Sequence, residues 1–273
     1  MARRRRKKRG NGLAAFAVVL LLVTATVYFK QGEENESCRE FGIELAIPQF
    51  TKSVKSQIIV HTGYTVSYNE QRRNANWVAY ELTAQEVEGV EARDDNFVPD
   101  PLVAGRQATT GDYRRSGWDR GHLAPAADMK WSRQAMEESF FMSNISPQNH
   151  NLNSGVWKSI EELVRDKAKE YNRVLVVTGP VFTSKKGLGE IGENRVLIPN
   201  GFYKVLLIYE NGYHGIGFYC ENKSGRKELK EYAATIDEIE EVTGIDFFHA
   251  LPDETESEVE AVYDYSVWES PSH

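Results

Sequence analysis

Two apolar runs that meet at an Asn-Gly pair place the strongest limit on how this 273-residue chain can fold. Residues 202–209 and 213–219 have strand composition and flank Asn211-Gly212, a dipeptide that favours the positive φ angles of a tight hairpin turn. Residues 64–68 and 77–82 have the same character and are joined by the polar turn NEQRRNAN. We therefore expect a sheet that contains at least two strand pairs of this kind.

Three segments predict helices. Ser132 is a candidate N-cap for a helix that runs to about Met142. Residues 153–169 carry apolar side chains every three or four positions, which is the helical period. Residues 235–238, TIDE, form a capping box, and Gly244 is a suitable helix stop.

A short apolar strand is expected at 174–178, ending at Gly179-Pro180. Strands and helices thus alternate irregularly along the chain. The repeated βαβ units of a parallel-sheet enzyme are missing from this pattern. The sequence therefore predicts one mixed α/β domain.

The N-terminus has a different character. Residues 1–10, MARRRRKKRG, hold seven basic side chains, and the 17 residues Leu13–Phe29 that follow carry no charge. Such a run reaches the lower limit for a membrane-spanning helix. We expect residues 1–29 to be a basic flank with an uncleaved anchor, although a signal peptide cleaved after Ala25 is the alternative. A buried helix and a mitochondrial presequence fit less well, because the run is apolar on every face.

The remaining boundaries follow from composition. Residues 30–53 are expected to be a linker and entry segment, and residues 253–273 an acidic tail. Between Leu251 and the C-terminus there are seven acidic residues and no lysine or arginine. Three aromatic residues in this segment suggest that its end docks onto the domain: Tyr263, Tyr265 and Trp268.

The two cysteines, Cys38 and Cys220, allow one disulfide if the domain lies outside the cytosol. Two free thiols are the equal alternative. The basic flank predicts that the N-terminus stays in the cytosol and that the rest of the chain lies outside it.

Net charge limits how the chain can bind nucleic acid. The whole chain carries −7, and without the seven leading basic residues 26 basic side chains face 40 acidic ones, a charge of −14. Bulk charge therefore argues against non-specific adhesion to a polyanion. Any phosphate binding must come from a local cluster of basic residues.

One such cluster lies in residues 116–125, SGWDRGHLAP. Arg120 has the donor geometry for a phosphate, and His122 can accept a proton near neutral pH. Gly121 between them would let a large ligand approach the backbone. Asp119, or a backbone carbonyl, is a candidate to fix the imidazole tautomer.

A second cluster follows in residues 140–161. Several of its amides must serve as turn and cap residues. Asn153, Trp157 and Glu161, however, are spaced i, i+4, i+8, which places them along one side of a helix. A carboxamide and a carboxylate two turns apart suit a hydrated Mg²⁺ ion, which needs few protein ligands.

The stretches DRGHLAPAADM and FMSNISPQNHNLNSGVWKSIEELVR, taken together, resemble the DNA/RNA non-specific endonuclease family. The resemblance extends over residues 54–252. It implies an α+β fold of the ββα-metal (His-Me finger) type, with a central, mostly antiparallel sheet flanked by helices. It also implies a metal-dependent endonuclease that cuts DNA and RNA with little sequence preference and leaves 5′-phosphate ends.

The same resemblance assigns roles to single residues. His122 matches the general base and Arg120 the phosphate-binding arginine. Asn153 matches the sole direct protein ligand of Mg²⁺, for which Mn²⁺ is an expected substitute. Glu161 matches the carboxylate that orients the hydrated ion.

Three further residues lie in matched motifs. Arg93, in EARDDNF, matches a second catalytic and substrate-binding arginine, while Asp119 and Asn144 are expected to support the site. Members of the family are often dimers, so a homodimer is one expected assembly.

Two other functions compete with a nuclease. One is a catalytically weak nucleic-acid-binding module on a membrane anchor, and the other is a membrane-anchored structural or adhesion protein. The expected location is the bacterial envelope, as an anchored or secreted protein, with a mitochondrial location as the alternative.

Overall fold

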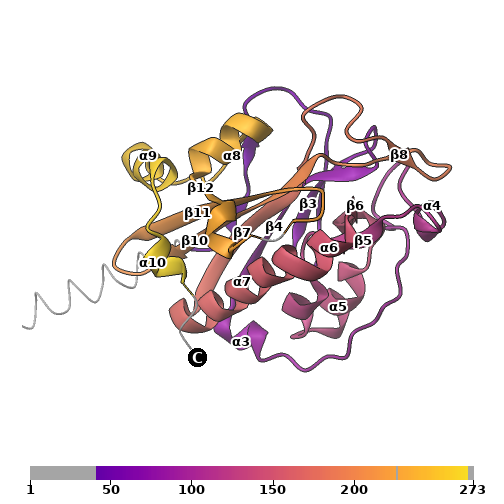
Figure 1. Ribbon diagram of the computed structural model, residues 1–273. Helices are drawn as coiled ribbons and strands as arrows, with labels where there is room; N and C mark the ends of the chain where they lie inside the picture. Colours follow the sequence, from indigo (N-terminus) through magenta and orange to yellow (C-terminus); the bar gives the residue numbers. More distant parts are fainter. Residues whose placement is uncertain (1–40, 226, 270–273) are drawn as a thin grey trace, which may run out of the picture. The chain divides into compact units, whose positions relative to one another are not determined.

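An antiparallel sheet of seven strands is the centre of the fold. A computed structural model describes residues 41–225 and 227–269, and the residues from Gly42 onward form one unit. From one edge to the other, the sheet strands of this unit are β12 (Ala233–Ala234), β11 (Tyr213–Glu221), β10 (Gly201–Tyr209), β7 (Arg173–Val181), β4 (Asn74–Thr83), β3 (Thr65–Asn69) and β2 (Gln57–Val60). Every neighbouring pair is antiparallel, as expected (Figure 1).

Three two-stranded ladders accompany this sheet. They are β1 (Gln49–Phe50) with β13 (Ile245–Asp246), β5 (Asp119–His122) with β6 (Ile145–Gln148), and β8 (Glu190–Ile191) with β9 (Val196–Leu197).

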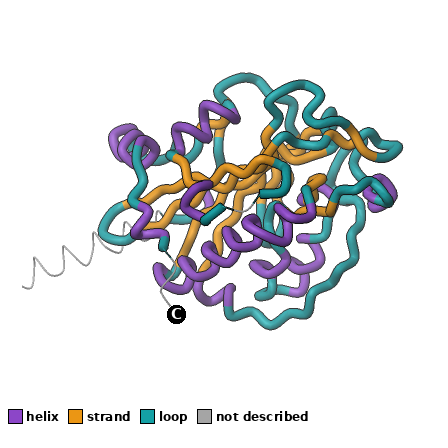
Figure 2. The backbone as a smooth tube through the Cα atoms, in the orientation of Figure 1, coloured by secondary structure: helices purple, strands orange, loops and turns teal. Residues whose placement is uncertain are grey.

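Helices and loops surround the strands (Figure 2). The α-helices are α2 (Ile43–Ala46), α3 (Ala84–Val87), α4 (Thr110–Tyr113), α5 (Arg133–Ser139), α6 (His150–Leu152), α7 (Lys158–Tyr171), α8 (Ile236–Thr243), α9 (Asp253–Ala261) and α10 (Tyr265–Trp268). The shorter helical turns are the 3₁₀ segments η1 (Ala126–Met129), η2 (Met142–Asn144) and η4 (Leu229–Tyr232), and the π-helical segment η3 (Asn153–Trp157).

The predicted hairpins are confirmed. β10 and β11 pair from Gly201↔Glu221 to Tyr209↔Tyr213, and Asn211 and Gly212 in the turn have φ angles of 54° and 151°. The second pair, β3 and β4, turns at the expected polar segment.

The capping box before α8 is also confirmed. The Thr235 hydroxyl accepts from the Glu238 backbone N–H at 3.1 Å, and the Glu238 carboxylate accepts from the Thr235 N–H at 2.8 Å. Gly244 ends the helix with φ 68°. Local chemistry alone therefore fixes both ends of this helix.

The strand predicted at 174–178 is longer than expected. β7 continues through Gly179-Pro180 to Val181, so the expected end at this dipeptide is wrong. Pairing of β7 with β4 stops at Thr178, whereas pairing with β10 goes on to Val181. Pro180 therefore has a neighbouring strand on one side only, and this is the setting in which a strand tolerates proline.

Two helix predictions need correction. α5 has the predicted Ser132 N-cap but ends at Ser139, and the 3₁₀ turn η2 begins only at Met142. The segment predicted as one regular helix over 153–169 is divided into the π-helical η3 and the α-helix α7. Gly155 has non-helical angles (φ −107°, ψ −116°) within η3.

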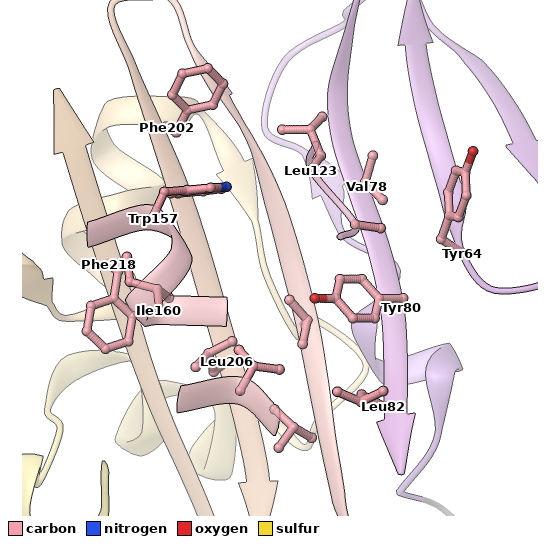
Figure 3. Packing of buried hydrophobic residues seen from close by; sticks show 14 of the residues in the cluster. Tyr64, Val78, Tyr80, Leu82, Leu123, Trp157, Ile160, Phe202, Leu206 and Phe218 are labelled. Carbon is pink, nitrogen blue, oxygen red and sulfur yellow. The ribbon is translucent and has the colours of Figure 1, made fainter. Parts of the chain in front are cut away.

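One face of the sheet packs against α7. Trp157 and Ile160 meet Phe202 of β10, with a distance of 5.6 Å between the Trp157 and Phe202 ring centroids. Figure 3 shows Trp157 below Phe202 and close to Ile160, with its indole nitrogen directed toward the segment that carries Leu123. Tyr80 and Leu82 of β4 extend the same core.

The opposite face packs against α8 and α9. Gly215 of β11 lacks a side chain on this face, and Ile236 of α8 and Val259 of α9 occupy the space beside it. Tyr203 of β10 also faces this side, where its ring lies 5.5 Å from Phe247. The sheet therefore separates α7 from the α8–α9 pair.

The C-terminal segment is not a solvated tail over its whole length. Residues 253–261 form α9, in which Val259 and Glu260 are buried. Trp268 of α10 is 1% exposed and belongs to the same core as Trp157, so the expected docking of the aromatic end is confirmed. The apolar side chains override the acidic composition, because burying them removes large areas from water.

The structure leaves several sequence predictions untested. The expected anchor at 13–29 and Cys38 lie outside the described residues, so the anchor and the disulfide stay predictions. Cys220 is fully buried at the end of β11. Among the described residues no helix is both long and apolar enough to cross a membrane.

Because the C-terminal segment packs onto the core, we predict that Trp268 contributes strongly to the stability of the domain. Replacing Trp268 with Ala should lower the free energy of unfolding by about 3–5 kcal/mol, because a fully buried indole is lost. Denaturant unfolding would measure the change. The control is Val262→Ala, at a side chain 68% exposed, which should change stability by less than about 0.5 kcal/mol. Equal small effects of both substitutions would show that the aromatic end does not dock.

Candidate active site

The motif DRGH forms strand β5, which pairs with β6, and β6 leads into a helical segment. β5 and β6 pair antiparallel from Asp119↔Gln148 to His122↔Ile145. Immediately after β6 come α6, η3 and α7. The local unit is therefore two strands and a helix, the ββα arrangement that the resemblance implied.

Gly121 serves the packing of this unit rather than the approach of a ligand. A Cβ atom at this position would lie 2.6 Å from Cβ of Gln148 on β6 and would also overlap the Gln148 amide. Gly121 thus lets the two strands sit close together. The expectation that it opens the backbone to a large ligand is wrong, because Gln148 already fills that space.

An aromatic pair holds the basic groups of the site. Phe97 and Phe140 meet edge to face with their centroids 4.9 Å apart, and the His122 ring packs on both, at 5.4 and 5.0 Å. The Arg120 guanidinium lies 4.1 Å from the Phe97 centroid, and that of Arg93 lies 5.0 Å from the Phe140 centroid. Cation–π contacts of this kind bring two arginines and the histidine together.

This setting keeps the His122 imidazole neutral. Burial, followed by the positive charge of Arg93 and then that of Arg120, lowers the pKa of His122 from 6.5 to about 3, while Asp95 acts in the opposite direction. The Nε2 atom of His122 is buried and has no hydrogen-bond partner among the described residues. A neutral imidazole is the form that accepts a proton.

The sequence suggested that Asp119 fixes the tautomer of His122. In the structure Asp119 instead contacts Asn153 and His150. Its Oδ2 atom accepts from the Asn153 Nδ2 at 3.0 Å and lies 2.9 Å from the His150 Nδ1. The bond to Nδ2 orients the Asn153 amide and leaves its Oδ1 as the acceptor atom. Asp119 therefore supports Asn153 directly.

Four of the predicted residues line one open pocket of about 730 Å³: Arg93, Asp119, Arg120 and Asn153. Phe97 also lines it and carries the His122 ring on its surface. Trp118 and Arg114 add further aromatic and basic character. The structure thus brings together a base, two guanidinium groups and a carboxamide that lie up to 60 residues apart in the sequence.

Glu161 belongs to a buried polar cluster next to this unit. Burial raises its pKa, and the Lys204 ammonium lowers it, while burial in turn lowers the pKa of Lys204. Asp128 and Arg165, joined at 2.8 Å, complete the cluster, and the Tyr80 hydroxyl donates to Asp128 at 2.9 Å. Glu161 is thus a partly buried carboxylate surrounded by charged groups, and it does not line the pocket described above.

Trp157 links this cluster to the base. Its indole N–H donates to the His122 backbone carbonyl at 3.3 Å, and the Lys204 Nζ lies 4.8 Å from its ring centroid. Lys204 also donates to the Leu123 carbonyl at 3.2 Å. Trp157 is fully buried, so it lies in the core rather than along an exposed side of the helix with Asn153. The π-helical turn and the kink at Gly155 change the i, i+4, i+8 geometry that a regular helix would give.

Asn144 is a scaffold residue. Its side chain accepts from the Ala124 N–H at 2.9 Å and donates to the carbonyls of Ala124 and Ser139, both at 2.8 Å. It is completely buried. Asn144 therefore fixes the chain just after His122 and supports the site without reaching the pocket.

Sequence reasoning missed the aromatic pair and the lysine. Phe97 and Phe140 carry no sequence signal that separates them from ordinary core residues. Lys204 does: it is the one charged residue in the apolar strand GFYKVLLIY, and it is fully buried. A lone lysine in such a strand indicates a buried partner.

The residues fit a hydrated hard cation. The Asn153 amide is oriented through its nitrogen, which leaves a neutral oxygen donor, and Asp119 adds negative charge beside it. Oxygen donors of this kind suit Mg²⁺, which keeps most of its water ligands. The donor set lacks the thiolates and imidazole pairs of a zinc site.

Comparison with known proteins agrees with this geometry. A family model described as DNA/RNA non-specific endonuclease matches residues 42–254. Nuclease EXOG, mitochondrial, from Xenopus laevis is 34% identical over 235 residues, which cover 80% of this chain and 63% of the relative. Endonuclease G, mitochondrial, from Homo sapiens is 35% identical over 196 residues, which cover 67% and 62%.

A shorter relative and a solved structure extend the comparison. Nuclease C1 from Cunninghamella echinulata var. echinulata is 33% identical over 205 residues, which cover 69% of this chain and 81% of the relative. A crystal structure of the EndoG/EndoGI complex matches with a TM-score of 0.69 and 28% identity, over 78% of this chain and 92% of that one. Against the two mitochondrial relatives above, the chain spans less than two thirds of their length.

The electrostatics of His122 predict an unusual titration. In metal-free protein, the NMR signal of the His122 ring should titrate near pH 3, and Arg93→Gln should move the inflection upward, because one repelling charge is removed. The unfolded chain has the ordinary value near 6.5 and binds more protons between the two values. The His122 contribution to stability is therefore complete above pH 6.5 and is lost as the pH falls toward 3. An inflection near 6.5 in the folded protein would contradict the lowering of the His122 pKa by its surroundings.

Proposed function

Because this chain belongs to the DNA/RNA non-specific endonuclease family, we propose that it is a metal-dependent endonuclease that hydrolyses phosphodiester bonds in both DNA and RNA. The observation that carries the proposal is the grouping of Arg93, Arg120 and Asn153 in one pocket, with His122 packed against its wall. These are the groups that phosphodiester hydrolysis needs: cations for the phosphate, a base for water and an oxygen donor for a metal.

The two arginines receive the phosphate. Their guanidinium groups are held by Phe140 and Phe97, and both remain exposed at the pocket. Charge that grows on the phosphoryl oxygens during attack is offset by these fixed cations. The aromatic contacts reduce the conformational freedom that the long side chains would otherwise lose on binding.

His122 removes the proton from the attacking water. Its imidazole is neutral in the free protein, so it is ready to accept that proton. The protonated ring is costly beside two arginines, and a bound phosphodiester lowers this cost by adding one negative charge. Substrate binding therefore raises the pKa of His122 before the imidazole accepts the proton from water.

Asn153 would hold the divalent cation through its Oδ1, and Glu161 would orient the hydration shell. Mg²⁺, with Mn²⁺ as a substitute, supplies Lewis-acid stabilisation of the phosphate charge when bound. Asp119 fixes the Asn153 amide through its nitrogen, and Trp157 donates to the His122 backbone carbonyl. The positive charge of Lys204 lies near Glu161 and lowers its pKa.

None of these groups reads a base edge or a sugar. The pocket contacts proposed here address the phosphate, so sequence preference should be low and both polymers should be cut. Attack of water with departure of the 3′ oxygen leaves 5′-phosphate and 3′-hydroxyl ends. The acidic remainder of the chain favours rapid release of the cut polymer.

Location and assembly belong to the same proposal. In this proposal residues 54–252 form the nuclease domain outside the cytosol, and residues 1–29 attach it to a membrane.

The mitochondrial names of two relatives favour a mitochondrial location over the bacterial envelope. Fractionation of cells that express the tagged full chain tests this choice. The homodimer implied by the family is tested by light scattering of the purified chain.

Loss of the base is the first test of the activity. With Mg²⁺, the full chain in detergent should nick plasmid DNA and degrade RNA, and EDTA should stop both reactions. His122→Ala should lower both rates by about 10²–10⁴-fold, because the general base is removed. The control is His214→Ala, on β11 outside the site, which should leave both rates unchanged.

Either of two results would refute the assignment. Near-wild-type rates of His122→Ala would remove His122 as the base. A folded wild-type chain that cuts neither polymer would favour the nucleic-acid-binding module, and salt-sensitive binding of the same preparation would then be measured.

Because Asp119 orients the Asn153 amide, we predict that its loss weakens Mg²⁺ binding. Asp119→Ala should raise the half-saturating Mg²⁺ concentration by about 10–100-fold, because the carboxamide loses its orienting acceptor. The maximal rate should be largely recovered at high Mg²⁺. Asp166→Ala, on the helix α7 and away from the pocket, is the matched control. An unchanged Mg²⁺ dependence of Asp119→Ala would show that Asn153 does not bind the metal.

A further inference from the structure

Three carboxylates meet between the two helices on the opposite side of the sheet from α7. They come from Asp237 and Glu240 of α8 and from Glu260 of α9, and each contributes an oxygen to a group in which all atoms lie within 4.8 Å of one another. Two oxygens on opposite sides of a Ca²⁺ ion are about 4.8 Å apart, since each Ca–O distance is about 2.4 Å. The three oxygens therefore lie close enough together to bind a single ion.

The innermost member of this carboxylate triad lacks a partner. Glu260 is only 7% exposed, and its Oε1 is buried without a hydrogen bond from any described residue. A buried carboxylate oxygen in this condition is costly. Glu240 is held in place, because its Oε1 accepts from the Phe247 backbone N–H at 2.7 Å.

The surroundings add negative rather than positive charge. Burial and then the neighbouring carboxylates raise the pKa of Glu260 to about 9, and burial likewise raises that of Glu240 to about 7. The further contributors are Asp246 of β13 and Glu256 of α9, which are also acidic. Among the described residues, no lysine or arginine forms an ion pair with the triad. Within residues 41–225 and 227–269 the triad thus has no basic counter-ion.

We propose that Asp237, Glu240 and Glu260 form a second cation site, which binds a hard divalent ion such as Ca²⁺ and clamps α8 to α9. Carboxylate oxygens alone are the ligands that Ca²⁺ accepts in six- to eight-coordinate, flexible sites. Glu260 supplies the enclosed side of the site. Asp237 is exposed, so the remaining positions on its side are open to water.

This site is separate from the nuclease pocket. α8 and α9 pack on the face of the sheet marked by Gly215 and Tyr203, whereas Trp157 and Asn153 belong to the helix on the other face. The ion would stabilise the C-terminal part of the fold and take no part in hydrolysis. The inference therefore stands or falls independently of the proposed nuclease activity.

Binding of ⁴⁵Ca²⁺ to the full chain in detergent, measured by equilibrium dialysis at pH 7.5, tests the site. Glu260→Gln should bind one Ca²⁺ per chain fewer than wild type. Asn153→Ala, which alters the nuclease pocket, should still bind Ca²⁺ at the triad. Glu258→Gln, an exposed residue on the same helix α9, is the matched control and should bind as wild type does. Asp237→Asn, which leaves the core intact, should weaken this Ca²⁺ by at least about tenfold.

Thermal unfolding gives a second readout. Ca²⁺ should raise the Tm of wild type and Glu258→Gln but not that of Glu260→Gln, because the ion binds the folded state alone. The Mg²⁺-dependent nuclease rate of Glu260→Gln should equal that of wild type. Equal Ca²⁺ stoichiometry and equal Tm shifts in wild type and Glu260→Gln would overturn the proposal, and the triad would then be a group of carboxyls that share protons.

Discussion

The hydrogen bond from the Trp157 indole to the His122 carbonyl joins the two halves of the ββα unit. Trp157 is fully buried below Phe202, so its position is set by the core of the sheet (Figure 3). The hydrogen bond fixes the His122 backbone in that position, and Lys204, which lies on the indole face, connects Trp157 to the polar cluster of Glu161, Asp128 and Arg165. The position of the base is therefore set by the buried side chain of Trp157 rather than by a surface loop.

An acidic protein can still hold a polyanion if its cations are concentrated. The Phe97–Phe140 pair concentrates the basic groups by packing one guanidinium on each ring and the imidazole against both rings. Because the two arginines share one small region, repulsion between their guanidinium groups is a cost of the free protein, in which His122 is neutral. A bound phosphate would relieve it. Local field, and not net charge, thus decides what the pocket attracts.

Features encoded by neighbouring residues could be predicted from the sequence. The hairpin at Asn211-Gly212 and the cap at Thr235 depend on φ angles and hydrogen bonds within a few positions, and both are found where expected. The chemistry of Arg120 and His122 already marked the DRGH segment as a candidate site, and the family resemblance assigned their roles. Features that depend on tertiary packing were not foreseen, such as the burial of Glu260 in α9. The kink at Gly155 was not foreseen either, because the helical period of the apolar residues continues through it.

Strand β1 has its only partner strand among the described residues at the other end of the domain. Gln49 and Phe50 pair with Asp246 and Ile245, almost two hundred residues later in the chain. The sheet can begin from its local hairpins, but the ladder of β1 and β13 cannot close until nearly the whole polypeptide has been made. Such long-range closure slows folding. A nascent chain would therefore spend much of its synthesis with this early segment unpaired, in need of protection from aggregation until its last helices arrive.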